Sequence, residues 1–251
     1  MLDAKHITCG YGGAPVVHDV SFTVPPNHTL CILGPNGCGK TTLLRAVAGL
    51  LPCEGSILAG GLAVHGARRV EVARKIALMT QLSTAYFSYT VYDTVMLGRY
   101  AHGKRGAFTG ESAQDRAIVL DCLARTGTLA LKDAEITQLS GGQLQRVFLA
   151  RTFAQSPQII LLDEPTNHLD LKYQLELTQY LRDWVKQDGR CVIGVLHDIN
   201  LALSFADSLL LMQDGRVFAE GPAEGFDLSL ISRIYGVDVG GYMRSALKRW
   251  E

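Results

Sequence analysis

The segment from Gly34 to Thr42 contains residue types and spacings that can bind phosphate groups. It matches the pattern G-x-x-x-x-G-K-[ST], in which backbone N–H groups surround phosphates and a lysine reaches the β and γ oxygens. We therefore predict that Lys40 contacts phosphates and that the Thr41 hydroxyl binds Mg²⁺. The alternative is an ordinary glycine-rich turn between a strand and a helix. The residues predicted to bind a nucleotide here are Gly34, Pro35, Asn36, Gly37, Cys38, Gly39, Lys40, Thr41 and Thr42.

Two acidic residues, Asp163 and Glu164, follow an apolar run of isoleucine and leucine at 159–162. Such a run is typical of a buried strand, and open α/β sheets place ligand-binding residues at the carboxyl ends of their strands. Asp163 can hold Mg²⁺, directly or through water. Glu164 is then free to orient or deprotonate an attacking water, which is the assistance that phosphoryl transfer needs. The alternative is a solvated acidic turn that caps the next helix.

Two further polar residues are expected at strand ends. His197 closes the apolar run Val192–Leu196, so its imidazole should emerge at the same sheet edge as Asp163 and can reach a γ-phosphate. Gln81 follows the apolar run 76–79 and can touch a metal ion or a water. Either side chain can instead be an ordinary core, surface or loop residue.

A second anion-binding element is predicted at residues 139–143, which read Leu-Ser-Gly-Gly-Gln. Ser140 can cap a helix that begins near Gln143, so that Gly141 and Gly142 expose backbone amides at its N-terminus. Two chains packed head to tail would let each site combine one chain's phosphate loop with the other chain's serine. Tyr11 is the aromatic candidate to stack on an adenine, and a strand tyrosine packed on the core is the alternative.

The elements that must position these residues alternate between strands and helices. This order predicts an α/β fold with a mostly parallel core sheet covered on both faces, preceded by an antiparallel β region. We expect hairpins formed by 5–11 with 16–24 and by 209–212 with 216–219, a β-rich stretch at 55–81, and a polar tail after 235. Strands are predicted at 29–33, 56–58, 75–79, 159–162 and 191–196, and helices at 42–48, 143–154, 173–185 and 228–235.

A separate helical lobe is predicted between Thr90 and Gly127. Helical spacing is present at 92–97 and 112–125, where Ala117, Leu120 and Ala124 are expected to form the apolar face. The glycines and basic residues of 98–110 predict a surface loop. We expect one domain spanning 1–251, with a helical subdomain at about 88–155 inserted in the nucleotide-binding core.

Composition narrows the class of protein. The chain has 251 residues, of which 47% are hydrophobic, and its 24 Lys and Arg balance its 24 Asp and Glu. The charge balance argues against a protein that binds nucleic acid by phosphate neutralisation alone. We found no run of about 18 apolar residues, so a cytosolic chain that does not span a bilayer is expected. The scattered cysteines predict reduced thiols without a disulfide framework or a metal site.

These residues together resemble the ATPase subunit of ATP-binding cassette (ABC) transporters. Six motifs occur in the order of that family, and the resemblance covers essentially the whole chain. They are the aromatic A-loop residue Tyr11, Walker A at 34–41, Q-loop Gln81, the signature at 139–143, Walker B at 159–164 followed by the D-loop Asn167-His168-Leu169-Asp170, and switch His197.

The resemblance implies ATP and Mg²⁺ as cofactors and assigns roles to several residues. Glu164 would be the catalytic base, Asp163 a magnesium-associated carboxylate, and His197 the γ-phosphate sensor. It also implies a nucleotide-sandwich homodimer in which Ser140 and Gly142 act on ATP held by the opposite subunit. That dimer would lie on the cytoplasmic face of the cell membrane, bound to a permease dimer and served indirectly by an extracytoplasmic substrate-binding protein.

Within the family, the segments 90–102, 166–171 and 197–203 resemble bacterial importers of iron siderophores, haem and cobalamin. The rival interpretation is a soluble ABC ATPase, for example a single-cassette scaffold for cluster assembly. A P-loop kinase leaves the signature unexplained. Cys38 departs from the serine frequent at its position, and a thiol at a helix N-terminus beside Lys40 is expected to have a lowered pKa and to be reactive when the site is empty. The alternative is a buried, inert thiol.

Overall fold

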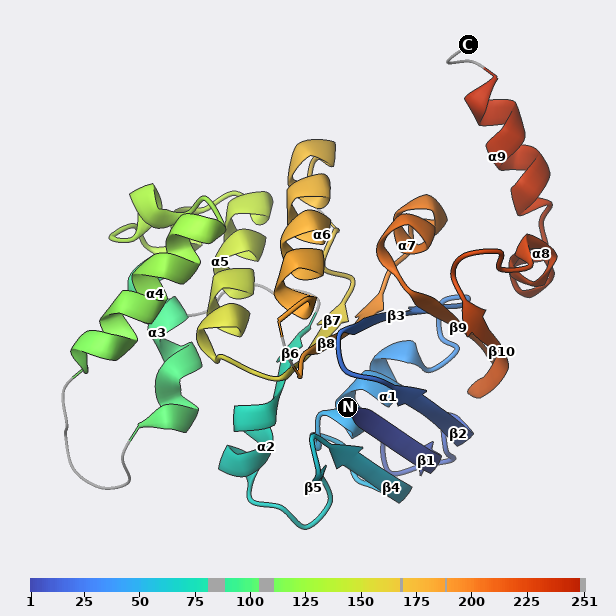
Figure 1. Ribbon diagram of the computed structural model, residues 1–251, viewed down its shortest axis with the longest axis horizontal. Coiled ribbons are helices and arrows are strands. Elements are labelled where there is room, and N and C mark those ends of the chain that lie inside the picture. The colour runs from blue at the N-terminus through green and yellow to red at the C-terminus, as the bar shows by residue number, and fades with distance from the viewer. Residues whose placement is uncertain (81–88, 104–110, 168, 188, 249–251) are drawn as a thin grey trace.

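A six-stranded sheet forms the centre of the protein (Figure 1). The computed structural model describes residues 1–80, 89–103, 111–167, 169–187 and 189–248. The strand order is β10-β9-β3-β8-β7-β6; neighbours from β9 to β6 are parallel, and β10 is antiparallel to β9. The predicted mostly parallel sheet is therefore confirmed. Its strands are β3 (His28–Leu33), β6 (Ile76–Met79), β7 (Ile159–Asp163), β8 (Cys191–Val195), β9 (Ser208–Gln213) and β10 (Arg216–Pro222).

A second, antiparallel sheet lies beside the first, with the order β2-β1-β4-β5. The hairpin predicted at the start of the chain is present, because β1 pairs with β2 across the turn that contains Gly12 and Gly13. The predicted strand at 56–58 is the central part of a longer strand. The strands of this sheet are β1 (Leu2–Cys9), β2 (Val17–Val24), β4 (Cys53–Ala59) and β5 (Leu62–Ala63).

The buried side chains form two apolar clusters that share the strands of the six-stranded sheet. Leu30 and Ile32 of β3 face the cluster that includes α1 (Lys40–Val47) and the second sheet, whereas Cys31 and Leu33 face the helices on the opposite side. Alternate side chains point to opposite faces of a strand, so a sheet covered on both faces needs apolar residues throughout. This requirement explains the uninterrupted apolar runs of β3, β7 and β8.

The remaining helices lie on the other face of the central sheet or beyond its two ends. In Figure 1, α3, α4 and α5 lie together at one end of the molecule, and α6 and α7 lie along the sheet. The extent predicted for a helical subdomain stays a prediction. These helices are α3 (Val91–Met96), α4 (Ala113–Arg125), α5 (Gly141–Ala154), α6 (Leu171–Val185), α7 (Ile199–Phe205), α8 (Leu228–Tyr235) and α9 (Val239–Leu247), with short 3₁₀ helices η2 (Leu129–Leu131) and η3 (Ile136–Gln138).

The apolar face predicted for α4 is wrong. Ala117 and Ala124 are exposed and Leu120 is only half-buried, whereas Val119 and Leu123 are fully buried against the neighbouring helices. Two alanines do satisfy helical spacing, but larger β-branched and leucine side chains bury more apolar area. The helix is therefore rotated relative to the prediction.

Three segments contain more helix than the sequence predicts. The β-rich stretch contains α2 (Arg69–Lys75), and the first part of the predicted surface loop is η1 (Leu97–His102), in which Gly98 is buried. The predicted polar tail contains α9, whose first turn holds Gly240 and Gly241. Glycine has a low helix propensity, so the sequence signal for α9 is weak. Asp238 compensates by accepting a hydrogen bond from the Gly241 amide at 2.8 Å.

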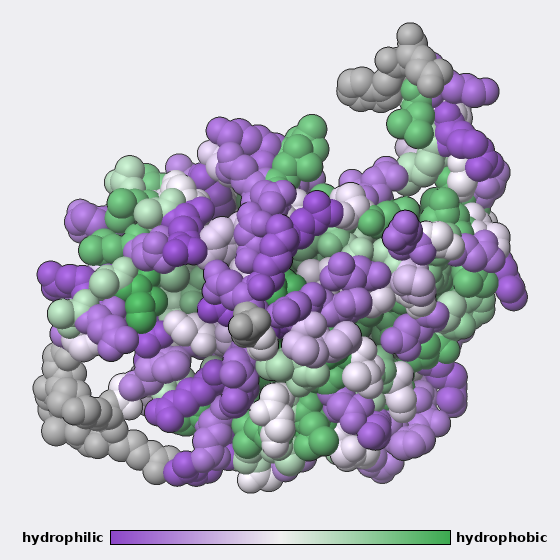
Figure 2. Space-filling model, viewed as in Figure 1, coloured by the Kyte–Doolittle hydropathy of each residue, from purple (hydrophilic) through white to green (hydrophobic). Residues whose placement is uncertain are grey.

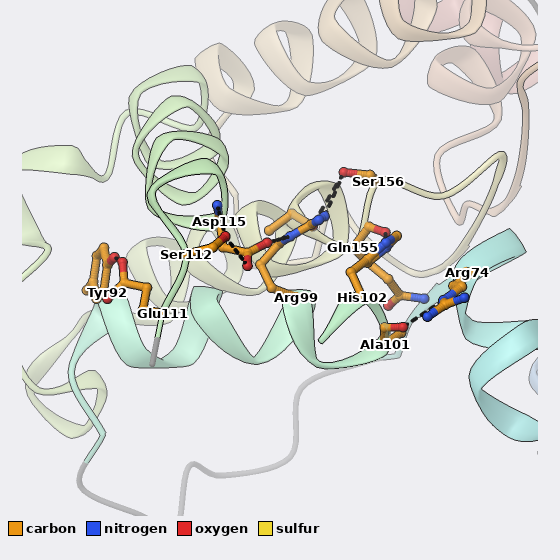
Figure 3. A network of polar contacts seen from close by, with 11 residues as sticks. Arg74, Tyr92, Arg99, Ala101, His102, Glu111, Ser112, Asp115, Gln155 and Ser156 are labelled. Carbon is orange, nitrogen blue, oxygen red and sulfur yellow. Dashed lines mark hydrogen bonds and ion pairs between the residues drawn. The ribbon is translucent and has the colours of Figure 1, made fainter. Parts of the chain in front are cut away.

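Polar contacts tie the helical end of the molecule to the sheet (Figure 3). Arg99 of η1 donates to Asp115 of α4 at 2.7 Å, to the Ala154 carbonyl at 2.6 Å and to Ser156 Oγ at 2.9 Å. Gln155 donates to the Ile76 carbonyl at 2.7 Å, at the start of β6. The ends of α5 and β6 are thus joined directly.

The surface seen in Figure 2 is unevenly apolar. The outward face of α6 is mainly hydrophilic, while hydrophobic residues gather around α8 and β10. Within the described ranges, we find no helix with the length and apolar character required to cross a bilayer.

Candidate functional site

Three strand ends meet at one edge of the central sheet. Ile32, Val195 and Asp163 are side by side in register, because β8 pairs with β3 on one side and with β7 on the other. The residues that follow are the phosphate-binding loop after β3, Glu164 after β7, and Leu196-His197 after β8. The expectation that His197 and Asp163 share a sheet edge is confirmed.

The loop Gly34–Gly39 has a backbone that requires glycine at two positions. A Cβ on Gly34 would lie 2.2 Å from the Met212 carbonyl oxygen, a distance that no real contact allows. Gly39 precedes α1 with φ 100°, in the left-handed region that glycine enters without steric cost. The loop therefore turns sharply from β3 into the N-terminus of α1, where helix amides and the helix dipole favour an anion.

Lys40 is almost fully buried at the first position of α1. Its Nζ donates to the carbonyl oxygens of Gly34 at 2.7 Å and Pro35 at 2.9 Å, so the side chain folds back into the loop. The ammonium group is therefore placed inside the ring of backbone groups that the sequence pattern predicts for phosphates. Asn36 and Gly37, at the tip of the loop, are exposed.

Thr41 and Asp163 form a pair of oxygen groups beside the loop. Thr41 Oγ1 donates to Asp163 Oδ1 at 2.9 Å, and Asp163 is buried. Burial raises the pKa of Asp163, and the hydrogen bond from Thr41 opposes part of that rise. A hydroxyl and a carboxylate are hard oxygen ligands of the kind that Mg²⁺ uses together with water and substrate phosphates. The residues present thus fit a magnesium ion at this position.

Glu164 has both carboxylate oxygens engaged by neighbouring side chains. Oε1 lies 2.5 Å from His197 Nε2, and Oε2 accepts from Asn167 Nδ2 at 2.6 Å. The backbone of Glu164 has φ 55°, which is uncommon for a residue with a side chain, and its amide donates to the Val195 carbonyl at 3.1 Å. The turn therefore directs this carboxylate toward His197 at the sheet edge.

Two contacts of the Glu164 turn were not predicted. The sequence predicts no partner for Asn167, and in the structure its side chain donates to the Glu164 carboxylate. Gln145 of α5 is 4% exposed and donates to the Pro165 carbonyl, which links the helix of the signature segment to this turn. A polar glutamine on an otherwise apolar helix face is the sequence signal that points to such a contact.

The signature segment forms the N-terminus of α5. Ser140 Oγ accepts from the Gln143 amide at 3.3 Å, and the Gln143 side chain accepts from the Ser140 amide at 2.9 Å, which makes a capping box. The predicted capping serine is confirmed, and Ser140 is exposed. Across the ranges that the structure describes, no hydrogen bond or ion pair connects Ser140, Gly141, Gly142 or Gln143 to residues 34–42.

Tyr11 lies in the turn between β1 and β2 and is 56% exposed, so the alternative of a core tyrosine is wrong. Its hydroxyl accepts from Arg45 Nη1 at 3.2 Å, and the Arg45 guanidinium lies 5.9 Å from the ring centroid. Arg45 belongs to α1, which follows the phosphate-binding loop. The ring is therefore exposed near the loop, as stacking on a base requires.

The expectation of a lowered thiol pKa at Cys38 is wrong. Cys38 is 6% exposed, and burial raises the pKa of its thiol despite the opposing effect of Lys40. Removal from water disfavours the charged thiolate more than one nearby cation and the helix terminus favour it. The prediction for Gln81 lies outside the described residues.

The fold and the site define a P-loop nucleoside triphosphatase: a phosphate-binding loop, an adjoining hydroxyl and carboxylate, and a second carboxylate paired with a histidine at one sheet edge. Comparison with known proteins narrows the class. The family described as ABC transporter matches residues 17–167. The chain belongs to this family and is an ATPase subunit of it.

Two relatives of this chain are named for siderophore transport. It is 37% identical over 239 residues to the Achromobactin transport ATP-binding protein CbrD of Dickeya dadantii (strain 3937), covering 94% of this chain and 88% of that one. It is also 37% identical over 238 residues to the Ferric enterobactin transport ATP-binding protein FepC of Escherichia coli (strain K12), covering 94% and 87%.

The fold is similar to that of a solved ATP-binding cassette. The structure described as the dimeric post-hydrolysis state of a cassette bound to ADP and Pi matches with a TM-score of 0.79 and 30% identity, over 90% of this chain and 100% of that one.

Proposed function

We propose that this protein is the ATP-hydrolysing subunit of a bacterial importer whose cargo is an iron chelate, haem, cobalamin or a similar metal-containing compound. The observation that carries the catalytic part is the Glu164 carboxylate, held by His197 and Asn167 beside the Thr41–Asp163 pair. The names of the siderophore-transport relatives support the cargo class. They also disfavour the soluble scaffold ATPase.

The phosphate-binding loop and Lys40 would bind the triphosphate. Backbone amides of the loop and of the first turn of α1 would surround the β- and γ-phosphates, and the Lys40 ammonium would turn from the loop carbonyls to phosphate oxygens. Thr41 and Asp163 would hold Mg²⁺, with Gln81 as a further ligand. Bound Mg²⁺ supplies neutralisation of phosphate charge. Tyr11 would stack on the adenine.

Glu164 would accept a proton from the attacking water. Its left-handed backbone and the Asn167 hydrogen bond fix the carboxylate, so little reorganisation is required when the water arrives. His197 is bonded to Oε1 of the same carboxylate and is 39% exposed in its side chain, which lets the imidazole also contact the γ-phosphate. The two residues would thus sense the triphosphate and act on water as a unit.

A homodimer would complete the site. Ser140 and the amides of Gly141 and Gly142 are presented at the exposed N-terminus of a 14-residue helix, with Gln143 in the capping box, and the solved cassette similar to this chain is a dimer. We propose that this terminus binds the γ-phosphate held by the other subunit. The dimer would bind a permease dimer peripherally, on the cytoplasmic face of the membrane, and act with an extracytoplasmic binding protein.

Uptake in a strain that lacks this gene tests the proposal. We expect loss of uptake of one radiolabelled cargo among ferric siderophores, haem and cobalamin, restored by the wild-type chain and not by Glu164→Gln. Normal uptake of all three classes, together with recovery of the protein free of any multi-helix membrane partner, would contradict the importer assignment.

A further inference from the structure

The hydroxyl of Tyr235 contacts the first residue of the phosphate-binding loop, 201 positions earlier in the chain. The Gly34 amide donates to the Tyr235 hydroxyl at 3.2 Å, and the hydroxyl lies 3.3 Å from the Gly34 carbonyl oxygen, to which it donates. Tyr235 is the last residue of α8, and its ring packs against the apolar cluster that contains Ile231 and Ile234. The helix therefore delivers one polar group to the start of the loop.

The Gly34 carbonyl has a second side-chain donor, the Lys40 ammonium at 2.7 Å. Gly34 itself is buried, and the Met212 carbonyl leaves no space for a Cβ at this position. Lys40 and Tyr235 thus donate to the same buried carbonyl. Of these two side chains, Lys40 is the one positioned to bind phosphate as well.

Nucleotide phosphates compete with the Gly34 carbonyl for the Lys40 ammonium. A buried carbonyl that loses its donor bears its full desolvation cost, and a carbonyl that keeps a donor does not. We propose that Tyr235 is a positioning residue for nucleotide binding: its hydroxyl remains on Gly34 when Lys40 turns to the phosphates, so α8 increases nucleotide affinity without touching the nucleotide. This inference rests on the proposed ATP site.

The Tyr235 hydroxyl is suited to this role at neutral pH. Burial raises the pKa of Tyr235, so the group stays protonated and keeps its donor. The neighbouring helix α9 makes a related contact, because Asn200 of α7 donates to Met243 Sδ at 3.3 Å. Since α7 follows His197 closely, the α8–α9 pair contacts segments from both sides of the site. Figure 1 shows α8 near β9 and β10, at the opposite end of the molecule from α3, α4 and α5, and α9 extending away from the sheet.

The test compares Tyr235→Phe with Tyr242→Phe in the full-length chain. Phenylalanine keeps the Tyr235 ring in its packing and removes only the hydroxyl. Tyr242 lies on α9 and is 71% exposed, which makes the same substitution there a matched control. We expect Tyr235→Phe to raise the Kd for MgADP and the KM for MgATP by ~2- to 10-fold, the value of one net hydrogen bond, with kcat almost unchanged. The control should leave all three constants unchanged.

A second measurement reports on the loop directly. Hydrogen–deuterium exchange in the peptide that contains Gly34 should be faster in Tyr235→Phe, because its amide loses an acceptor. Unchanged Kd and KM, or a fall in kcat alone, would overturn the inference, and so would unchanged exchange at Gly34. Failure of the proposed function is a separate result, in which the wild-type chain itself neither binds nor hydrolyses ATP.

Discussion

The Glu164 carboxylate is held on both oxygens, which makes a conservative substitution informative. Glu164→Gln keeps the size of the side chain and removes the proton acceptor, while Lys40 and the loop are unchanged. We expect turnover to fall by ~10²- to 10⁴-fold, as for loss of a general base, with nucleotide affinity retained. Single-turnover hydrolysis and equilibrium binding measure the two effects. Hydrolysis at a wild-type rate would remove Glu164 from its assigned role.

The buried Cys38 thiol leads to a pH-dependent prediction. Burial raises its pKa above the ordinary value of 9.0, so the thiolate fraction should keep rising with pH throughout the range from pH 7 to pH 9. Alkylation of Cys38, followed by peptide mapping, should accelerate across this whole range. A plateau within it would show a lowered pKa and restore the reactive cysteine that the sequence predicts.

The sequence predicts the Glu164 site correctly and the pKa of Cys38 wrongly, for different physical reasons. The rule that parallel strands present ligands at their carboxyl ends brings Glu164 and His197 together from sequence alone. The pKa of Cys38 is mispredicted, because the helix terminus and the nearby Lys40 can be read from the sequence whereas the burial of the thiol cannot. Asn167 and Tyr235 acquire their partners only through tertiary packing, so no local pattern reveals them.

At the scale of elements, Arg99 connects η1, α4 and the end of α5. Its side chain is only 10% exposed and is bonded to Asp115, Ala154 and Ser156. Arg99→Met should lower the free energy of unfolding by about 2 kcal/mol, since it removes charged hydrogen bonds and takes a donor from the carbonyl of the buried Ala154 and from the partly buried Asp115. Chemical denaturation measures the loss. Arg116→Met is the control because the Arg116 side chain is 66% exposed, and a similar loss in both variants would contradict a special role for Arg99.

The elements themselves were predicted unevenly. Long apolar runs identify β3, β7 and β8, and the residues around Ser140 identify the start of α5. The rotation of α4 was missed because Ala117 and Ala124 satisfy helical periodicity while Val119 and Leu123 bury more area. The helix α9 was missed because Gly240 and Gly241 dilute its local signal, although Asp238 caps it.

At the scale of the whole molecule, the proposed dimer places two parts of each site on different chains. Ser140→Arg should block the nucleotide of the opposite subunit, and Lys40→Ala should impair binding within its own subunit. Each homodimer should be inactive. In a heterodimer of the two variants, one composite site carries both substitutions and the other carries none.

We therefore expect partial ATPase activity to return when these variants are co-expressed with different tags and purified through both. The measurement is the ATPase rate of the doubly purified heterodimer relative to each parent. If the ATPase activity does not recover in verified heterodimers, this would count against two independent composite sites that each combine residues of both subunits.

The order of strands in the central sheet has a consequence for biosynthesis. β3 and β7 are synthesised before β8, yet each reaches the other only through β8, which lies between them. A growing chain that already contains the phosphate-binding loop and Glu164 still lacks the strand that sets them side by side. We therefore expect the complete site to form late on the ribosome, after Cys191–Val195 have emerged, and the apolar faces of the earlier strands to be prone to aggregation until then.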